Sequence, residues 1–323
     1  MAPPNPTIRR YGSAAIAEAA ARIVAGGLVA VPTETVYGLA ADATSAAAVA
    51  RIYAAKGRPS FNPLIVHVPD LAAAEAIAVF DDDARALAAA FWPGPLTLIL
   101  PLLGNGRIAR AVTAGLDTVA IRVPAHRAMR ALLDACGVPL AAPSANRSNG
   151  VSPTRAAHVA ASLGARVPLI VDDGACPTGV ESTIVRRRTI LRPGPVTAEM
   201  IAALFPGEGR GPVTQPPDGG LRPSPANTLI DAPGQLASHY APTKPLRLNA
   251  TTAEPDEYLI GFGPIAGDAT LSGTGDLTEA AARLFDLLHI ADASTSPRIA
   301  VAPVPGHGIG AAINDRLRRA ATR

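Results

Sequence analysis

Short apolar runs alternate with alanine-rich amphipathic stretches through the first two thirds of the chain. Residues 13–25 begin at a capping serine and end before two glycines, which predicts a helix, and the apolar run 28–32 predicts a buried strand. The pattern repeats, with helices expected at 46–55, 70–80, 82–91, 125–136, 154–164 and 198–205, and strands at 64–68, 96–100, 118–123, 139–142, 169–173, 182–187 and 189–194. This alternation predicts an α/β fold built on a twisted, open, mixed sheet. The last three strands are expected close together, with part of the sheet antiparallel.

The pattern changes after residue 205. Residues 206–243 are rich in glycine and proline and show almost no periodicity, which indicates a linker or a functional loop. Beyond them, strands are expected at 246–250, 257–262 and 298–304, and helices at 278–293 and 308–321. We therefore expect a larger domain over 1–205, a linker over 206–243 and a smaller α/β domain over 244–323.

The composition is typical of a globular chain. Apolar residues make up 48% of the 323 residues, but no apolar run reaches the roughly 18 residues of a membrane span. The two cysteines, Cys136 and Cys176, are too few for a disulfide framework, and the N-terminus lacks the apolar core of a secretory signal. No membrane anchor and a cytoplasmic location are expected. The net charge of +3 does not by itself indicate nucleic-acid binding.

The turn KGRPSFNP carries the densest candidate chemistry. Lys56 and Arg58 lie at the end of an expected helix, where cations suit the helix dipole. A phosphate-bearing ligand explains the polar residues that follow: Lys56 acts as a point charge and Arg58 as a fork, and Ser60 and Asn62 add neutral donors. The chain has neither a Walker A motif nor GxGxxG at a strand-to-helix junction, so any nucleotide is held in an unusual way.

Two polar residues lie inside expected strands. His67 is expected on the side of its strand opposite Ile65, and a lone histidine in a strand is more often a satisfied core residue than a ligand. Arg122 lies in the apolar run TVAIRV. Either a buried carboxylate or the carboxylate of a ligand can be its partner, and the sequence leaves both open.

Hydroxyl and amide side chains gather at three other expected strand ends, where α/β sheets bind ligands. The stretch VPTETVYG is explained equally well by contacts with a ligand and by an ordinary capped turn. The loop APSANRSNGVSPT has side chains that can donate to phosphate or ribose without formal charge. The candidates in these stretches are Thr33, Glu34, Thr35, Tyr37, Ser144, Asn146, Ser148, Asn149, Ser152, Ser182, Thr183 and Arg192.

Several chemistries lack their usual sequence signatures. The histidines and cysteines have no metal-ligand spacing, and neither GxSxG nor an activated cysteine is present, which disfavours covalent catalysis. The remaining cations and hydroxyls suit the positioning of reactants and the stabilisation of phosphoryl charge. No residue is assigned as a general acid or base, and none as a metal ligand.

Six blocks in order, PTETVYGL, KGRP..NPLIVH, TVAIRVP, APSAN.S...SPT, ESTIV and LRPG, resemble the YrdC-like domain of the threonylcarbamoyl-AMP synthases. PGQLASHYAP and GIGAAINDRLRRAA resemble the linker and the Rossmann-like extra domain of the long, two-domain form. The resemblance implies that L-threonine, bicarbonate and ATP, with Mg2+, give threonylcarbamoyl-AMP and pyrophosphate for tRNA threonylcarbamoyladenosine modification. It also implies a downstream tRNA threonylcarbamoyl transferase machinery as partner and a weak contact with tRNA.

The resemblance also assigns site residues and a lid. It implies ATP binding by Lys56, Arg58, Ser60, Asn62, Thr118, Ser144, Asn146, Ser152, Arg192 and Tyr240. It implies L-threonine binding by Thr33, Tyr37, His67, Arg122, Ala142, Ser182 and Thr183, with Arg122 at the carboxylate. The run from His239 to Pro242 resembles a segment that covers the family's active site, so the linker is expected to act as a lid. The family pattern is broken at Asn149-Gly150 and at Gln235.

Two other interpretations remain. The same fold can serve as an RNA-binding module without catalysis, but such a module has no reason to combine Thr33, His67 and Arg122 with the cationic turn. Carbamoyl transfer to a different acceptor, as in hydrogenase-maturation relatives, calls for acylphosphatase-like and zinc-finger segments, and the sequence contains neither.

Overall fold

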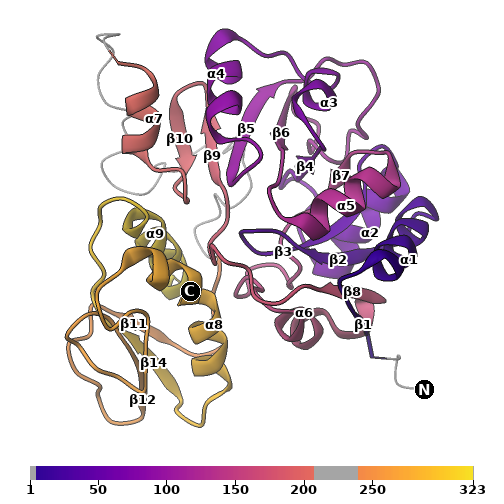
Figure 1. The fold of residues 1–323 in the computed structure, drawn as a ribbon. Helices are drawn as coiled ribbons and strands as arrows, with labels where there is room; N and C mark the ends of the chain where they lie inside the picture. Colours follow the sequence, from indigo (N-terminus) through magenta and orange to yellow (C-terminus); the bar gives the residue numbers. More distant parts are fainter. Residues whose placement is uncertain (1–4, 207–238, 323) are drawn as a thin grey trace.

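The computed structural model describes residues 5–206 and 239–322, which form two α/β units (Figure 1). The larger unit contains one ten-stranded sheet, in the order β1-β8-β2-β3-β7-β4-β6-β5-β9-β10, which confirms the expected mixed α/β architecture. Its strands are β1 (Thr7–Arg10), β2 (Val29–Pro32), β3 (Tyr37–Asp42), β4 (Ile65–His67), β5 (Leu96–Pro101), β6 (Thr118–Arg122), β7 (Leu140–Ala141), β8 (Leu169–Asp172), β9 (Thr183–Arg186) and β10 (Thr189–Arg192).

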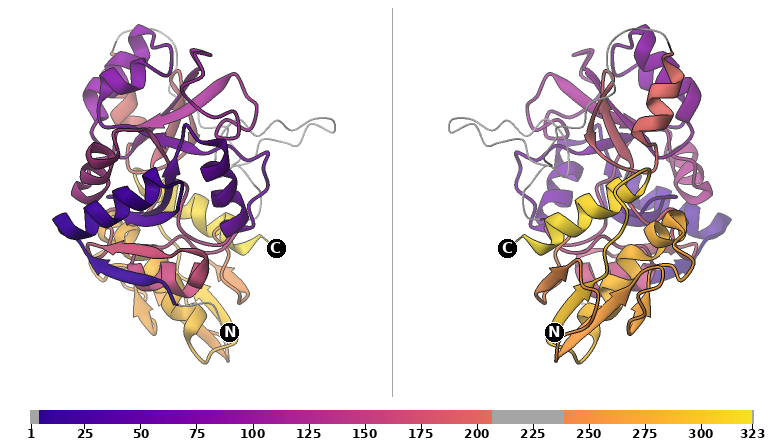
Figure 2. Two further views of the ribbon diagram at one scale, coloured as in Figure 1. Left: turned by 90° about the vertical axis from the view of Figure 1, so that its right-hand side faces the viewer. Right: turned by 90° about the vertical axis from the view of Figure 1, so that its left-hand side faces the viewer.

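Parallel and antiparallel pairings alternate irregularly in this sheet. β4 runs parallel to β6 and antiparallel to β7, and β9 and β10 form an antiparallel hairpin at one edge. The expectation that three late strands lie close together is wrong for β8, which pairs with β1 and β2 near the other edge (Figure 2). Two strands were not expected: β1, because all four of its residues are exposed, and β3, because it follows a turn-like sequence.

Small side chains form much of the packing surface of the first helix of the larger unit, α1. Alanines dominate the buried face of α1, which packs on α5, so the two helices and the sheet approach closely. The helices are α1 (Ser13–Val24), α2 (Ala46–Lys56), α3 (Leu71–Glu75), α4 (Asp82–Phe91), α5 (Arg127–Cys136), α6 (Ala156–Leu163) and α7 (Ala198–Leu204), with a 3-10 turn at Gly164–Arg166. The helix expected at 70–80 is reduced to the short α3, which Asp70 caps.

The smaller unit is a four-stranded sheet in which all the pairings are parallel, in the order β11-β14-β12-β13. Its elements are β11 (Leu246–Leu248), β12 (Glu257–Gly261), β13 (Ala269–Thr270), α8 (Leu277–Ala293), β14 (Arg298–Val301) and α9 (Gly310–Ala321). The Asp276 side chain caps the first turn of α8. Within the described ranges, no helix combines the length and the apolarity needed to cross a membrane.

Helices α8 and α9 connect the two units. Arg155 forms a bidentate ion pair with Asp286 of α8, and the rings of His158 and His289 stack with centroids 3.9 Å apart. The expected linker and lid over 206–243 lies mostly outside the described residues, since 207–238 are not described, and the three-segment division stays a prediction. The described end of that segment, from His239 onward, lies between the two units.

Candidate active site

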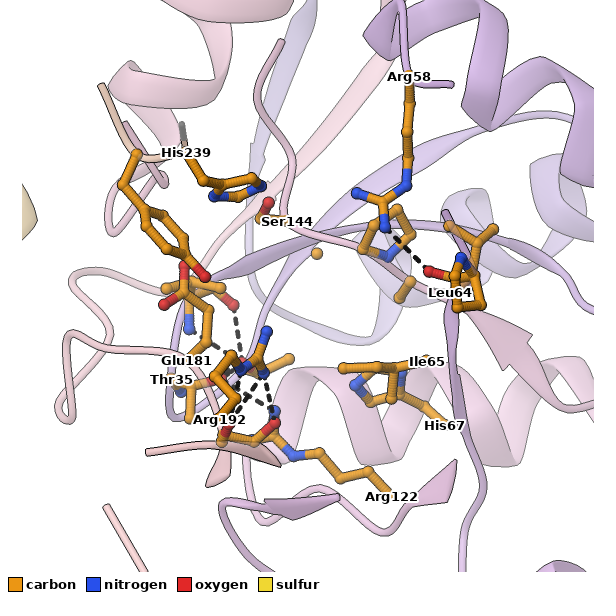
Figure 3. A pocket seen from close by; sticks show the side chains of 18 residues that line it. Thr35, Arg58, Leu64, Ile65, His67, Arg122, Ser144, Glu181, Arg192 and His239 are labelled. Atoms are coloured by element: carbon orange, nitrogen blue, oxygen red, sulfur yellow. Dashed lines mark hydrogen bonds between the residues drawn. The ribbon is translucent and has the colours of Figure 1, made fainter. Parts of the chain in front are cut away.

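One cavity collects the ends of several strands of the large sheet (Figure 3). Its empty space, about 570 Å³, includes a part that is open to solvent. Nine of the predicted site residues line it, drawn from both the ATP set and the threonine set: Thr33, Arg58, His67, Arg122, Ala142, Ser144, Ser182, Arg192 and Tyr240. The tertiary structure therefore brings together residues that lie far apart in the sequence.

β4 contributes an apolar and a polar wall to the cavity. Ile65 and His67 both line it and lie side by side in Figure 3, so the expectation that they face opposite sides is wrong. Residues two apart in a strand share one face, which explains the arrangement. Burial, together with the charge of Arg122, lowers the pKa of His67 to about 3, so this imidazole is neutral at physiological pH.

Arg122, at the end of β6, has a buried carboxylate partner. Its Nη2 lies 2.6 Å from Glu34 Oε1, and its Nη1 donates to the Thr35 hydroxyl at 3.0 Å. Burial works to raise the pKa of Glu34, but the Arg122 charge and hydrogen bonds outweigh it, and the pKa lies below its usual value. The ion pair and the hydrogen bond to Thr35 hold the guanidinium at the cavity wall.

Two further arginines face the cavity from other elements. Arg58 extends from the turn after α2 towards the middle of the cavity (Figure 3), and its Nη2 donates to Asn62 Oδ1 and Pro63 O. Arg192 donates to the backbone oxygen and the hydroxyl of Ser182. Burial lowers the pKa of Arg58 to about 10 and also lowers that of Arg192. Buried cations of this kind favour an anionic ligand.

Lys56 does not line the cavity. Its ammonium donates to the backbone oxygens of Ser144 and Asn146, at 2.5 Å each, and the side chain is 3% exposed. Burial and the nearby Arg58 charge hold its pKa well below the usual value. The lysine therefore ties the end of α2 to the loop that presents Ser144 to the cavity.

His239 and Tyr240 close the cavity on the side of the smaller unit. Their rings meet edge to face with centroids 4.0 Å apart, and Tyr240 stacks on Phe285 of α8. Burial and the charges of Arg58, Lys56 and two other arginines hold the pKa of His239 well below its usual value, so the imidazole is neutral. The two aromatic rings therefore cover this side of the cavity without adding a charge.

Unpaired polar atoms concentrate around this cavity. Among the described residues, eight buried side-chain nitrogen or oxygen atoms lack a hydrogen-bond partner, and all but Arg22 Nε belong to the cavity wall or its supports: Asn62 Nδ2, His67 Nδ1, Asn146 Oδ1, Ser148 Oγ, His239 Nδ1, Tyr240 Oη and Arg316 Nη2. Buried polar groups are nearly always paired in folded proteins. Their concentration here indicates a site built for a polar ligand.

The comparisons with known proteins agree with this geometry. Residues 21–194 match the family model described as "Telomere recombination", and residues 196–322 match "Threonylcarbamoyl-AMP synthase, C-terminal domain". The chain is 41% identical to the threonylcarbamoyl-AMP synthase of Bacillus subtilis over 95% of its own length and 92% of that protein. It belongs to the threonylcarbamoyl-AMP synthase family.

Two archaeal matches cover both units of this family member. The threonylcarbamoyl-AMP synthase of Pyrococcus abyssi is 37% identical over 94% of the chain and 92% of that protein. The crystal structure of P. abyssi Sua5 complexed with L-threonine superposes with a TM-score of 0.86 at 35% identity, covering 98% of this chain and 96% of that one. The fold of both units, and not the larger sheet alone, is therefore that of the family.

The remaining predicted residues of this synthase-family chain lie outside the cavity lining. The Tyr37 hydroxyl donates to Asp172 and Gly174 O, and the Thr183 hydroxyl donates to Val196 O. Thr118 lies at the end of β6 opposite Arg122, and Ser60 is exposed. Three others act as supports: Asn62 holds Arg58, the Asn146 amide donates to Gly150 O, and the Ser152 hydroxyl donates to Glu181.

The sequence analysis did not assign every residue of the site to a ligand. Glu34 was expected only as part of a polar turn, and Thr35, Glu181 and His239 were not assigned to a ligand, although the last three line the cavity. The signal for Glu34 was present, because a buried arginine calls for a carboxylate, but the sequence could not identify which one. Glu181 immediately precedes the predicted residue Ser182. The hydrophobic periodicity of the sequence does not distinguish a carboxylate that lines a cavity from one that faces solvent.

Proposed function

We propose that this chain is an L-threonylcarbamoyladenylate synthase, which makes threonylcarbamoyl-AMP and pyrophosphate from L-threonine, bicarbonate and ATP. The observation that carries the proposal is the joining of two residue sets in one cavity. Buried cations with lowered pKa values, Arg58 and Arg192, share it with the Arg122–Glu34 pair and the neutral His67. The first two suit a triphosphate, and the second group suits the carboxylate and the neutral amine of an amino acid.

The reaction needs alignment more than acid–base chemistry. The neutral amine of threonine takes up the carbon of bicarbonate, giving a carbamate and water. A carbamate oxygen then forms a bond to the α-phosphorus of ATP as the bond to pyrophosphate breaks. Arg58 and Arg192 offset the charge that moves onto the departing pyrophosphate, and Arg122 holds threonine by its carboxylate. His239 and Tyr240 exclude water from a hydrolysable product.

Mg2+ and the cellular partners complete the proposal. The described residues contain no cluster of three or more His, Cys, Asp or Glu side chains suited to a metal. Both carboxylate oxygens of Glu181 already have protein partners, Ser152 and Arg316, so an Mg2+ ion would arrive with ATP and would supply charge neutralisation at the phosphates. The product passes to a tRNA threonylcarbamoyl transferase machinery in the cytoplasm, with at most a weak contact between this chain and tRNA.

Pyrophosphate release from ATP tests the proposed function. We expect release to require both L-threonine and bicarbonate, because the attacking group is the carbamate and not water. L-serine, which lacks the methyl group of threonine, and L-valine, which lacks its hydroxyl, serve as comparison amino acids in the same assay. Release at an equal rate without L-threonine contradicts the proposal.

The RNA-binding alternative is disfavoured by burial. Lys56, Arg58, Arg122 and Arg192 are each 8% exposed or less, so their charges cannot reach the phosphates of an RNA lying on the surface. Non-catalytic RNA binding relies on an exposed basic face. These four cations instead face the cavity or its supports.

A further inference from the structure

Arg316, on α9 of the smaller unit, is fully buried against the candidate active site. Its Nε lies 2.9 Å from Glu181 Oε2, and Glu181 lines the cavity. Its Nη1 donates to Pro193 O at 2.9 Å. Pro193 directly follows Arg192 in the chain. A single side chain of the second unit therefore contacts two segments of the cavity wall contributed by the first.

The same guanidinium also packs against Tyr240. Its carbon lies over the tyrosine ring, 5.2 Å from the centroid, in a cation–π contact. Tyr240 has a φ of +63°, a left-handed conformation that a bulky residue adopts only where its surroundings impose it. Arg316 and Phe285, which both pack against the tyrosine ring, provide those surroundings.

Glu181 links this cation to the predicted ATP set. Its other carboxylate oxygen accepts a hydrogen bond from the Ser152 hydroxyl, and Ser152 O lies 3.1 Å from His289 Nε2 of α8. Without Arg316, the Glu181 carboxylate is left in a buried cavity beside the place proposed for a triphosphate. An uncompensated anion there repels the phosphates and is itself costly to bury.

The geometry points to Arg316 as a positioning residue that completes the ATP half of the active site from the second domain. It acts through Glu181, whose charge it neutralises and whose carboxylate it orients, and through Tyr240, which it holds against the cavity. The inference rests on the proposed function, and it gives the smaller unit a role in the reaction itself. It also means that the larger unit alone lacks a part of the site.

Steady-state kinetics on the full chain test this role. We expect Arg316→Met to raise the KM for ATP about tenfold or more, because displaced groups at an active site are costly even when they touch no reacting atom. The KM for L-threonine should stay within about twofold of wild type, since the Arg122–Glu34 side is untouched. Arg318→Met, an exposed arginine on the same helix, is the matched control and should leave both values unchanged.

Two further variants separate positioning from folding. Arg316→Lys keeps a buried cation but cannot reach Glu181 and Pro193 O together, so its KM for ATP should lie between those of wild type and Arg316→Met. Arg316 also pairs with the buried Asp315, but that carboxylate keeps Arg319 as a partner when Arg316 is replaced. Adding Glu181→Gln to Arg316→Met removes the uncompensated anion at the cavity and should recover part of the ATP affinity. Equal increases in both KM values, or an Arg316→Met enzyme that matches Arg318→Met, overturn the inference. Absence of pyrophosphate release by the wild-type chain overturns the proposed function instead.

Discussion

The two lysines of this arginine-rich chain have the same structural role, and an arginine would suit it less well. Lys56 and Lys244 each direct the ammonium at backbone carbonyl oxygens: those of Ser144 and Asn146 in one case, and those of Ala291 and Ser294 in the other. A compact ammonium can donate in several directions from one point, whereas a guanidinium is a planar fork. At the scale of the residue, Lys56 is thus a support of the loop that presents Ser144 to the cavity.

Replacing Lys56 tests whether it anchors that loop. Lys56→Met leaves two buried carbonyls without a donor, so we expect unfolding free energy to fall by about 2 kcal/mol. Amide hydrogen exchange in residues 144–150 should become faster even without ATP. Lys244→Met is the control, because it removes the same kind of contact from α8 and should leave exchange in 144–150 unchanged. An unchanged exchange rate in Lys56→Met without ATP identifies Lys56 as a ligand contact only.

At the scale of the element, the segment between β8 and β9 connects the two units. Gly179 lies in it with a φ of +74°, and a Cβ there would come within 2.3 Å of Ala281 O in α8. Two residues later the same segment presents Glu181 to the cavity. The close approach of this segment to the α8 backbone therefore sets where Glu181 meets Arg316.

Gly179→Ala should separate α8 from this segment. We expect it to lower the unfolding free energy about 2 kcal/mol more than Gly137→Ala, since the clash with backbone adds to the strain of a positive φ. Gly137 also has a positive φ, at the end of α5, but a Cβ there meets nothing within 4 Å. Denaturant unfolding of both variants measures the difference. If the two substitutions destabilise the chain equally, α8 does not pack tightly on the segment.

At the scale of the whole molecule, the histidines make stability depend on pH. Burial lowers the pKa values of five of them: His67, His126, His158, His239 and His289. A histidine whose pKa is lowered by folding binds its proton more readily in the unfolded chain, so stability falls as pH drops below about 6.5. For a fully buried histidine the loss is up to about 1.4 kcal/mol per pH unit.

Thermal unfolding at a series of pH values measures this dependence. We expect the melting temperature to fall between pH 7 and pH 5, a window in which ordinary carboxylates stay ionised. His67→Gln should make the slope shallower, because the substitution removes a group that is protonated only in the unfolded chain over this range. A slope identical to that of wild type shows that His67 takes up its proton equally in both states.

Much of the fold was predictable from local pattern. The capped alanine-rich stretches gave helices close to the expected bounds, as in α2, which begins after Ser45 and ends at Lys56 before Gly57. Strand predictions failed where the burial of residues does not follow the hydrophobic pattern of the sequence. β1 is a polar strand that exists because it pairs with β8, and β8 lies far from its sequence neighbours because the pairing is long-range. Such pairings are absent from local sequence.

The chain's amino-acid order alone determined the α/β class, the family and most of the polar residues around the cavity, because periodicity, capping and motif spacing are local properties. Only the tertiary structure decided which carboxylate pairs with Arg122, that Lys56 holds a loop, and that Arg316 of the second unit contacts Glu181. These are contacts between residues distant in the chain, and they depend on which side chains burial forces together. A buried charge must find a partner, but the sequence does not state which partner the fold brings within reach.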